Sequence, residues 1–149
     1  MSMMKKILVI HGPNMNLLGQ RETDIYSKNT LKEINQKLKN LGKNQQVICE
    51  FFQSNFEGEI VSKIQNCQND INFIIINPAA YTHTSVAIRD ALIGMNIPFI
   101  EVHMSNIYKR ELFRHHSYLS DIAYGVVIGM GLKSYELALN AAIEYTCAK

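Results

Sequence analysis

Tryptophan is absent from this sequence of 149 residues, and proline, cysteine and long apolar runs are scarce. The three cysteines, Cys49, Cys67 and Cys147, are odd in number and far apart, without metal-ligand spacing. They therefore indicate reduced thiols rather than disulfides or a zinc site, and we expect a cytoplasmic location. The first apolar run, residues 7–10, is too short for the core of a signal peptide or for a membrane span.

A strong excess of charge is lacking as well. Lysine and arginine number 15 against 13 acidic residues, a formal net charge of +2, and the two signs are interspersed. This distribution gives no electrostatic footprint for nucleic acid or for a membrane surface, although a small anionic substrate stays compatible with it. The length predicts one domain, residues 1–149, with a single sizeable core.

What is present is a regular alternation of strand and helix patterns. Residues 73–76 form an unbroken apolar run rich in isoleucine, typical of a strand buried on both faces of a parallel sheet. Further strands are predicted over residues 7–10, 47–53, 98–102 and 125–128. Because helical segments separate these strands, the sequence predicts an α/β fold: a single-domain, flavodoxin-like, doubly wound sheet of five parallel strands.

Capping signals mark where the helices begin and end. Thr30 with Glu33 and Ser54 with Glu57 read as capping boxes, and Gly42 is expected to end the first helix. Thr84 or Ser85 is expected to cap a third helix. The buried face of that helix is predicted to carry Ala87, Ile88, Ala91 and Leu92, and a last helix after Gly131 is predicted to turn Tyr135, Ala138, Ala142 and Tyr145 to one side.

Polar residues gather where the predicted strands end. Right-handed crossovers place every strand-to-helix loop on one edge of the sheet, so the ends of the first, third and fourth strands should converge. The third strand stops at Asn77 and Pro78 and is followed by Thr82, His83 and Ser85, which we interpret as the floor of a site. The long connection at residues 13–29 is too apolar for a free linker and is predicted to form a lid.

Several kinds of chemistry can be weighed at this edge. Gly12 and Gly19 match neither a P-loop nor a dinucleotide fingerprint, and the strand ends lack the acidic cluster of a receiver domain. Glu101 and His103 lie two residues apart on a strand and so point the same way. They form either a metal-binding pair or, the interpretation we favour, a carboxylate that orients a histidine tautomer. The neutral polar groups and arginines suit proton transfer on a hydroxylated or carboxylated small molecule.

Several motifs along nearly the whole chain carry a resemblance to a known family. They are His11-Gly12-Pro13-Asn14-Met15-Asn16-Leu17-Leu18-Gly19 with Arg21 and Tyr26, Gln53-Ser54-Asn55 with Glu57-Gly58, Asn77-Pro78 with Thr82-His83-Thr84-Ser85 and Arg89-Asp90, Glu101-Val102-His103 with Ser105-Asn106, Arg110-Glu111, and Phe113-Arg114-His115-His116-Ser117. In order and spacing the sequence resembles the type II 3-dehydroquinate dehydratases. The resemblance implies conversion of 3-dehydroquinate to 3-dehydroshikimate, on the shikimate route to chorismate, without metal or cofactor.

The resemblance also implies residue roles. Tyr26 would remove a proton alpha to the ketone, and His103, oriented by Glu101, would protonate the departing hydroxyl. A phenolate at neutral pH requires its pKa to fall by roughly three units from about 10, which corresponds to about 4 kcal/mol. A guanidinium lowers a nearby pKa by about 1 to 3 units, the part that Arg21 would play. Asn14 would hold a water, or the oxygen itself, where the enolate forms.

Substrate-binding residues follow from the same resemblance. Asn77 would hold the substrate carboxylate together with the backbone N–H groups of Met104 and Ser105. The substrate hydroxyls would be read by His83, Asp90 and Arg114, while Arg110 would assist Arg21. Asp90 points away from the loop edge by its helical position, and in the family it reaches a neighbouring subunit within a dodecamer built of trimers.

The sequence departs from the family pattern at a few positions, none of which has a chemical task. Thr23 and Ser27 stand in the predicted lid where proline and glycine are usual, and Ala79-Ala80 replaces a pair containing glycine. An alternative stays open: a non-catalytic flavodoxin-like module that binds a nucleotide or flavin, in which Tyr26 only packs the lid. A nucleotidyl transferase would require a second pair of histidines after a later helix, and the sequence has none there.

Overall fold

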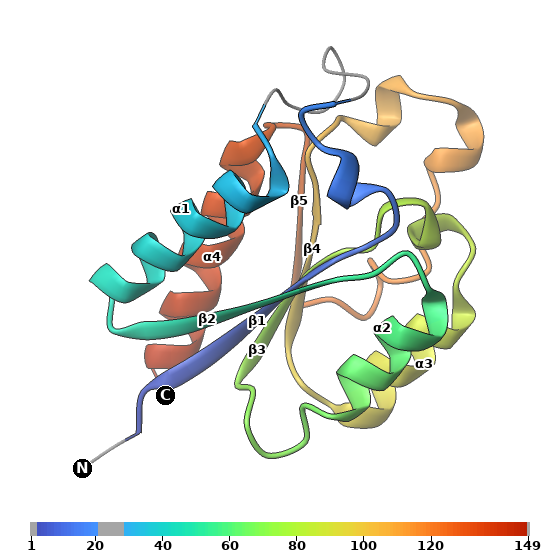
Figure 1. Ribbon diagram of the computed structural model, residues 1–149. Helices are drawn as coiled ribbons and strands as arrows, with labels where there is room; N and C mark the ends of the chain where they lie inside the picture. The colour runs from blue at the N-terminus through green and yellow to red at the C-terminus, as the bar shows by residue number, and fades with distance from the viewer. Residues whose placement is uncertain (1–2, 21–28, 149) are drawn as a thin grey trace.

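The computed structural model describes residues 3–20 and 29–148, in which five strands form one sheet in the order β2-β1-β3-β4-β5 (Figure 1). The strands are β1 (Lys5–His11), β2 (Val47–Gln53), β3 (Phe73–Asn77), β4 (Phe99–His103) and β5 (Gly125–Ile128). Every neighbouring pair runs parallel. The predicted flavodoxin-like sheet is confirmed, with its topological switch point between β1 and β3.

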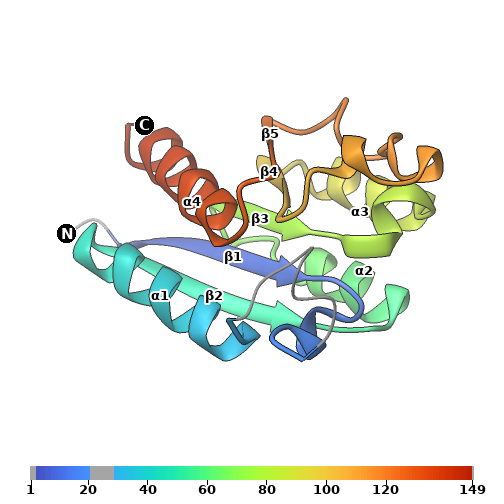
Figure 2. The ribbon, with the colours of Figure 1, turned by 90° about the horizontal axis from the view of Figure 1, so that it is seen from above.

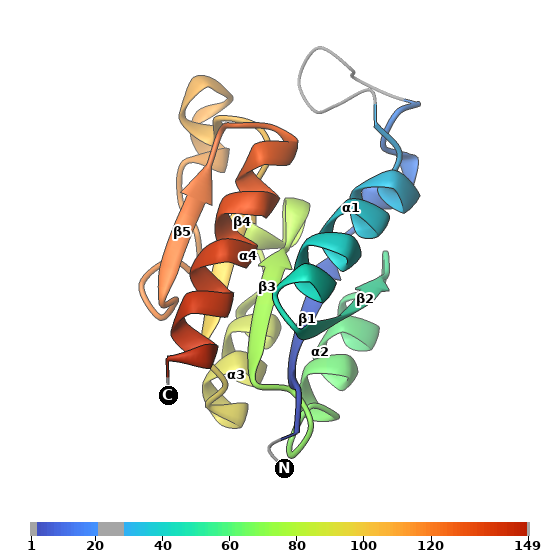
Figure 3. The same cartoon turned by 90° about the vertical axis from the view of Figure 1, so that its left-hand side faces the viewer.

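Helices cover both faces of this sheet. They are α1 (Leu31–Asn44), α2 (Glu57–Gln65), α3 (Val86–Met95) and α4 (Leu132–Cys147). Figure 3 shows α1 and α4 in front of the sheet and α2 and α3 behind it, and Figure 2 separates the same two layers from above. Single 3-10 turns follow the strand ends: η1 (Met15–Leu17), η2 (Ala79–His83), η3 (Ile107–Lys109) and η4 (Leu112–Arg114).

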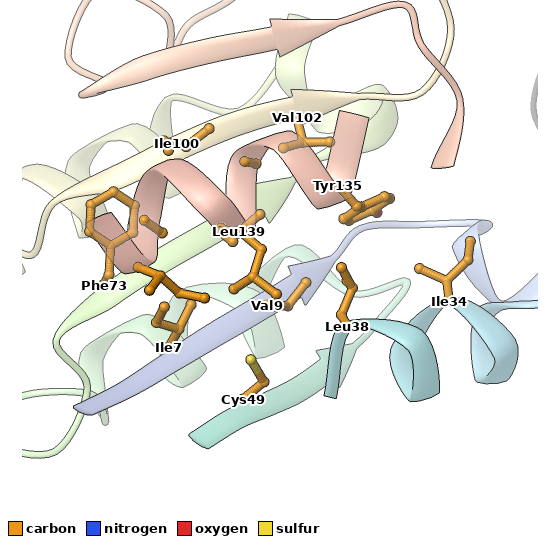
Figure 4. Close-up of a cluster of buried hydrophobic side chains, with 14 of the residues drawn as sticks. Ile7, Val9, Ile34, Leu38, Cys49, Phe73, Ile100, Val102, Tyr135 and Leu139 are labelled. Atoms are coloured by element: carbon orange, nitrogen blue, oxygen red, sulfur yellow. The ribbon is translucent and has the colours of Figure 1, made fainter. Parts of the chain in front are cut away.

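Alternate residues along the central strands pack into two separate apolar cores, one on each face of the sheet. Ile7, Val9, Phe73 and Ile75 pack with Leu139 between the sheet and the α1/α4 layer (Figure 4). The residues between them on β1 and β3 pack toward α2 and α3 instead: Leu8, Ile10, Ile74 and Ile76. On β4 the even-numbered Ile100 and Val102 belong to the α1/α4 core. The same alternation turns the polar strand ends to opposite faces: His11 and Asn77 toward α1 and α4, Glu101 and His103 toward α2 and α3.

Two of the predicted helix caps are present. The Thr30 hydroxyl accepts a hydrogen bond from the Glu33 backbone N–H at 3.2 Å and begins α1. Of the two candidates for α3, Ser85 is the cap, because its hydroxyl accepts from the Ile88 N–H at 2.9 Å. On α3, Ile88, Ala91 and Leu92 are buried as predicted, whereas Ala87 is exposed.

The predicted capping box at Ser54 is wrong. Helix α2 begins at Glu57 with Phe56 in the cap position and no side-chain cap. The Ser54 hydroxyl instead accepts a hydrogen bond from the Phe56 N–H at 2.9 Å and contacts the Glu59 carboxylate. A serine that bonds the backbone two residues ahead forms a local turn, which here precedes the helix rather than capping it.

Gly42 does not end α1 as predicted, because the helix continues to Asn44. A Cβ added at Gly42 would lie 2.6 Å from Cys49 Sγ and 3.1 Å from the Val47 carbonyl oxygen. The glycine therefore permits close packing of α1 on β2. The other predicted boundaries hold to within one or two residues, and the fourth strand runs one residue later than expected, so that His103 belongs to it. None of the helices in the described ranges is long and apolar enough to cross a bilayer.

Candidate active site

A pocket opens beyond the carboxyl ends of β1, β3 and β4, where the topology leads strand ends to converge. It is lined by Pro13, Asn14, Met15, Leu18, Asn77, Ala79, Ala80, His83, His103, Met104, Ser105, Ile107, Arg110 and Arg114. The lining comes from η1, η2, η3 and η4 as well as from the strands, so each loop after these strands contributes a wall.

Glu101 and His103 form a hydrogen-bonded pair at the end of β4. His103 Nε2 lies against Glu101 Oε2, while Glu101 Oε1 accepts hydrogen bonds from Ser117 Oγ at 2.9 Å and Ser120 Oγ at 2.7 Å. Burial alone would raise the pKa of Glu101, but the hydrogen bonds from His103, Ser120 and Ser117 outweigh it and hold that pKa below its ordinary value.

Glu101 is therefore a charged carboxylate with no exposed surface. It accepts a hydrogen bond from His103 Nε2–H, which leaves Nδ1 as the nitrogen that can act in the pocket. This arrangement matches a carboxylate that orients a histidine tautomer. Within residues 3–20 and 29–148, no three or more His, Cys, Asp or Glu side chains are grouped to hold a metal ion.

Asn77, at the end of β3, is the most buried of the amides that line the pocket, with 4 % of its surface exposed. Its Oδ1 accepts a hydrogen bond from the Ala79 N–H at 3.1 Å. Its Nδ2 lies 3.1 Å from the Tyr135 hydroxyl and 3.5 Å from Met15 Sδ. Hydrogen bonds at both its oxygen and its nitrogen thus hold the amide at the wall of the pocket.

Behind Asn77 a chain of buried polar groups crosses to α1. The Tyr135 hydroxyl lies 2.9 Å from His11 Nδ1, and His11 Nε2 lies 2.7 Å from Asn35 Oδ1. His11 and Tyr135 are both fully buried. Burial lowers the pKa of His11 to about 4 and raises the pKa of the Tyr135 hydroxyl far above its ordinary range, so both are neutral at neutral pH.

His83, at the end of η2, donates from Nδ1 to the His116 carbonyl oxygen at 2.7 Å, because a carbonyl can only accept. Its Nε2 is then the acceptor nitrogen of the neutral ring. Burial is the main cause that lowers the pKa of His83, against the opposing effect of the His116 carbonyl, and the nearby charges of His103 and Arg114 lower it further. His83 is thus a neutral hydrogen-bonding group beside the pocket.

Two arginines supply the positive charge of the pocket. Arg110 Nη1 lies 3.4 Å from Ser105 Oγ, and Arg114 Nε donates to Glu111 Oε1 at 2.9 Å. Both guanidinium groups are partly buried and line the pocket, together with Met104 and Ser105. A partly desolvated cation attracts an anion more strongly than an exposed one, so this wall suits a carboxylated ligand.

Asn14 lines the pocket from the loop after β1 in a left-handed backbone conformation, with φ 68°. Its backbone N–H donates to Asn55 Oδ1 at 2.9 Å, which ties the loop after β1 to the loop after β2. Two residues earlier, close packing requires the glycine Gly12, since a Cβ there would lie 2.5 Å from the Pro78 carbonyl oxygen. The two loops therefore keep Asn14 and Asn77 in one pocket.

Comparison with known proteins identifies this architecture. The family model described as dehydroquinase class II matches residues 5–143. The chain belongs to the class II dehydroquinase family.

Relatives and solved structures agree along nearly the full length of this dehydroquinase. The 3-dehydroquinate dehydratase of Polynucleobacter asymbioticus is 61% identical over 144 residues, which are 96% of this chain and 97% of the relative. That of Acinetobacter baylyi is 59% identical over 143 residues, 95% of this chain and 96% of the relative. The crystal structure of type II dehydroquinase from Butyrivibrio crossotus superimposes with a TM-score of 0.91 at 44% identity, covering 93% of this chain and 97% of that one.

Some residues predicted for the dehydroquinase site lie outside the described residues or away from the described pocket. Arg21 and Tyr26 lie outside the described residues, as does most of the predicted lid, including the departures at Thr23 and Ser27. Asp90 lies on α3 and is exposed, away from the pocket lining of its own chain. Thr82 and Ser85, expected at the floor of the site, are buried and are not among the residues that line the pocket. The other described residues with a predicted catalytic or binding role line the pocket, except Glu101, which contacts the lining residue His103.

Sequence reasoning gave no site role to four polar residues around this dehydroquinase pocket, although His11 and Ser117 belong to the family motifs. They are His11 and Tyr135 behind Asn77, and Ser117 and Ser120 behind Glu101. A signal for His11 was available, because it ends β1 in register with Asn77 at the end of β3. Tyr135 was predicted only as one apolar position of the last helix. The two serines lie in an irregular segment that has no periodicity to orient them.

Proposed function

We propose that the chain is a type II 3-dehydroquinate dehydratase, which eliminates water from 3-dehydroquinate to give 3-dehydroshikimate in the shikimate pathway. The observation that carries the proposal is family membership over almost the whole chain, at up to 61% identity to a protein of that name. The pocket supports it independently, because an oriented histidine and two arginines face one cavity. These are suitable groups for proton transfer on a carboxylated ring.

The proposed reaction passes through an enolate. The Tyr26 phenolate, stabilised by Arg21 with help from Arg110, takes the proton alpha to the ketone, and the electron pair left behind delocalises onto the ketone oxygen. Asn14 stabilises that oxygen directly or through a water. Collapse of the enolate breaks the bond to the departing hydroxyl, which accepts a proton from His103 and leaves as water. Glu101 supports His103 by stabilising the imidazolium from which the proton comes.

The substrate is proposed to bind by its carboxylate to Asn77 and to the backbone N–H groups of Met104 and Ser105. Its hydroxyls are then read by His83 and Arg114 and by Asp90 of a neighbouring subunit. Support comes from the pocket lining, which contains every one of these residues except Asp90. The exposed position of Asp90 on α3 suits a contact across subunits.

The chain is further proposed to assemble into a dodecamer built of trimers and to work in the cytoplasm without metal or cofactor. Cys49, Cys67 and Cys147 are free thiols, which suits a reducing compartment. Light scattering after size-exclusion chromatography tests the assembly by its mass. A trimer or smaller species at micromolar concentration would contradict the dodecamer.

A turnover assay tests the function. Purified protein should convert 3-dehydroquinate to an enone that absorbs near-ultraviolet light, and neither a chelator nor borohydride added with substrate should inactivate it. A yellow or nucleotide-retaining preparation without turnover would favour the non-catalytic module instead. Inactivation by borohydride would indicate a Schiff base on lysine and overturn the enolate scheme.

The role of Tyr26 has its own test. Tyr26→Phe removes the general base while keeping the ring, and turnover should fall about 100-fold or more. Tyr124→Phe is the matched control, because Tyr124 is an exposed tyrosine remote from the pocket lining, and it should keep full activity. A loss of less than about threefold in Tyr26→Phe would assign Tyr26 to packing.

A further inference from the structure

The buried chain behind Asn77 has a single hydrogen-bond direction. The Ala79 N–H can only donate, so it fixes Asn77 Oδ1 as an acceptor and turns Nδ2 toward Tyr135. The Tyr135 oxygen then accepts from Asn77, and its own hydrogen points to His11 Nδ1. His11 must in turn donate from Nε2, and its partner there is the Asn35 carbonyl oxygen.

This direction needs a neutral His11. An imidazolium would carry hydrogens on both nitrogens and would set a donor against the Tyr135 hydroxyl hydrogen. The full burial of His11 favours the neutral ring, in agreement with the lowered pKa. Each hydrogen bond from Asn77 Nδ2 through Tyr135 to His11 Nε2 therefore joins a donor to an acceptor, and Asn77 cannot flip its amide without breaking bonds at both ends.

The fixed amide leaves one N–H directed at a weak partner. Asn77 Nδ2 has two hydrogens: one goes to Tyr135, and the other meets Met15 Sδ at 3.5 Å. A thioether is a poor acceptor. Both Asn77 and Met15 line the pocket, so the oxygen of a bound ligand can replace the sulfur as a stronger acceptor.

We propose that Tyr135 and His11 are positioning residues of the active site. Neither lines the pocket, and they act by holding the Asn77 amide with an N–H available to the substrate. This inference rests on the proposed function, because it assigns to Asn77 a contact with the substrate carboxylate. It adds two residues of β1 and α4 that affect substrate binding and turnover through a third. Figure 4 shows Tyr135 in the α1/α4 layer, between α4 and the end of β1.

A double-mutant cycle tests the inference. Tyr135→Phe removes the hydroxyl and keeps the ring, and kcat/KM should fall about tenfold in the parent chain, the effect expected for a lost buried hydrogen bond. In an Asn77→Ala background the same substitution should change kcat/KM less than about twofold, because the residue through which it acts is gone. An equal factor in both backgrounds would overturn the inference and make Tyr135 merely structural.

A control variant and a substitute variant distinguish a positioning role of Tyr135 from a role in folding. Tyr145→Phe removes a hydroxyl from the same helix at its far end, where the ring packs on Phe73 and Tyr124. It should leave kcat/KM within about twofold of the parent. If Tyr135→Phe does not fold, His11→Gln takes its place in the cycle, with the same loss expected in the parent and the same absence of loss in Asn77→Ala.

Binding distinguishes failure of this inference from failure of the proposed function. Calorimetric titration with 3-dehydroshikimate should show the same pattern as the kinetics: weaker binding in Tyr135→Phe, and no further weakening when Asn77 is already alanine. An unmodified chain without turnover would refute the function while this binding cycle still tests the positioning. Equal weakening in both backgrounds would refute the positioning in a chain that turns over normally.

Discussion

Two polar networks support the pocket from opposite faces of the sheet, and they differ in charge. On the α2/α3 face the network is ionic: the Glu101 carboxylate accepts from His103, Ser117 and Ser120. On the α1/α4 face it is neutral: Asn77, Tyr135, His11 and Asn35 pass hydrogen bonds along one line. Each network ends on a pocket residue, His103 in one case and Asn77 in the other.

The difference in charge between the two networks has two causes: the alternation of side chains along each strand, and the different groups that the networks support. Because side chains of one strand alternate between faces, a strand end can place a charged group in one layer and a neutral group in the other. A buried carboxylate is stable only with several donors, and Glu101 has three. In the proposed mechanism His103 donates a proton and benefits from such a charge. The proposed contact of the Asn77 amide with a ligand needs a fixed orientation instead, which neutral hydrogen bonds provide without the cost of burying charge.

The largest effect is expected from breaking the ionic network. Glu101→Gln keeps the shape but replaces one acceptor oxygen by a donor, which then faces a hydroxyl or the His103 N–H. The charge that supports an imidazolium is lost as well. We expect kcat to fall about 100-fold or more, the range of lost general acid catalysis. Steady-state kinetics, with unfolding midpoints measured in parallel, check this.

Glu144→Gln is the matched control, since Glu144 is exposed on α4, and its kcat should be unchanged. If Glu101→Gln retained kcat within about threefold of the parent, the charge of Glu101 would have no part in the chemistry. The two networks would then differ in composition but not in function.

The second prediction concerns His11 in the neutral network: it should make the free energy of unfolding depend on pH. The pKa of His11 is about 4 in the folded chain and about 6.5 when unfolded. The unfolded chain therefore binds the extra proton between these values. The stabilisation is fully present above about pH 6.5 and is lost as the pH falls toward 4, in total about 3 kcal/mol.

Chemical denaturation at several pH values between about 7 and about 4.5 measures this dependence. A chain carrying His11→Gln should lose stability less steeply over that interval, even if it is less stable at neutral pH. His115→Gln is the control, because His115 is only partly buried and bonds to a backbone carbonyl, and it should leave the His11-dependent slope in place. Identical slopes with and without His11 would mean that it is not buried as a neutral ring.

The comparison also explains what the sequence could predict. Glu101 and His103 lie on one strand two residues apart, so their contact follows from the period of a strand alone. His11 and Asn77 lie on different strands, and their pairing requires the register of β1 with β3. Tyr135 requires in addition the packing of α4 on the sheet. The fold itself was predictable because short apolar runs and helical patterns alternate in a regular order.

The failed predictions have local physical causes. Gly42 and Ser54 carry end signals of a helix, but close packing on Cys49 and a local turn at Phe56 account for them instead. Ser117 and Ser120 lie in a segment without periodic burial, so nothing in the sequence directs them toward Glu101. Propensity predicts elements, whereas contacts between elements depend on tertiary packing.

The smallest effect is expected where the neutral network meets the backbone. Ala79, whose N–H holds Asn77 Oδ1, has φ 53°, in the left-handed region where glycine is favoured. Ala79→Gly removes that strain but gives the unfolded chain more freedom. We expect the free energy of unfolding to rise by up to about 1 kcal/mol, measured by denaturant unfolding.

Ala80→Gly is the matched control for Ala79→Gly, because it lies in the same turn without a positive φ. Glycine at position 80 relieves no strain and only increases the conformational entropy of the unfolded chain, so the free energy of unfolding should fall by about 0.5–1 kcal/mol. Opposite signs at two adjacent alanines would locate the strain at the residue that fixes the Asn77 amide. A loss of stability in both variants would mean that Ala79 is not strained, and the orientation of Asn77 would then depend on Tyr135 and His11 alone.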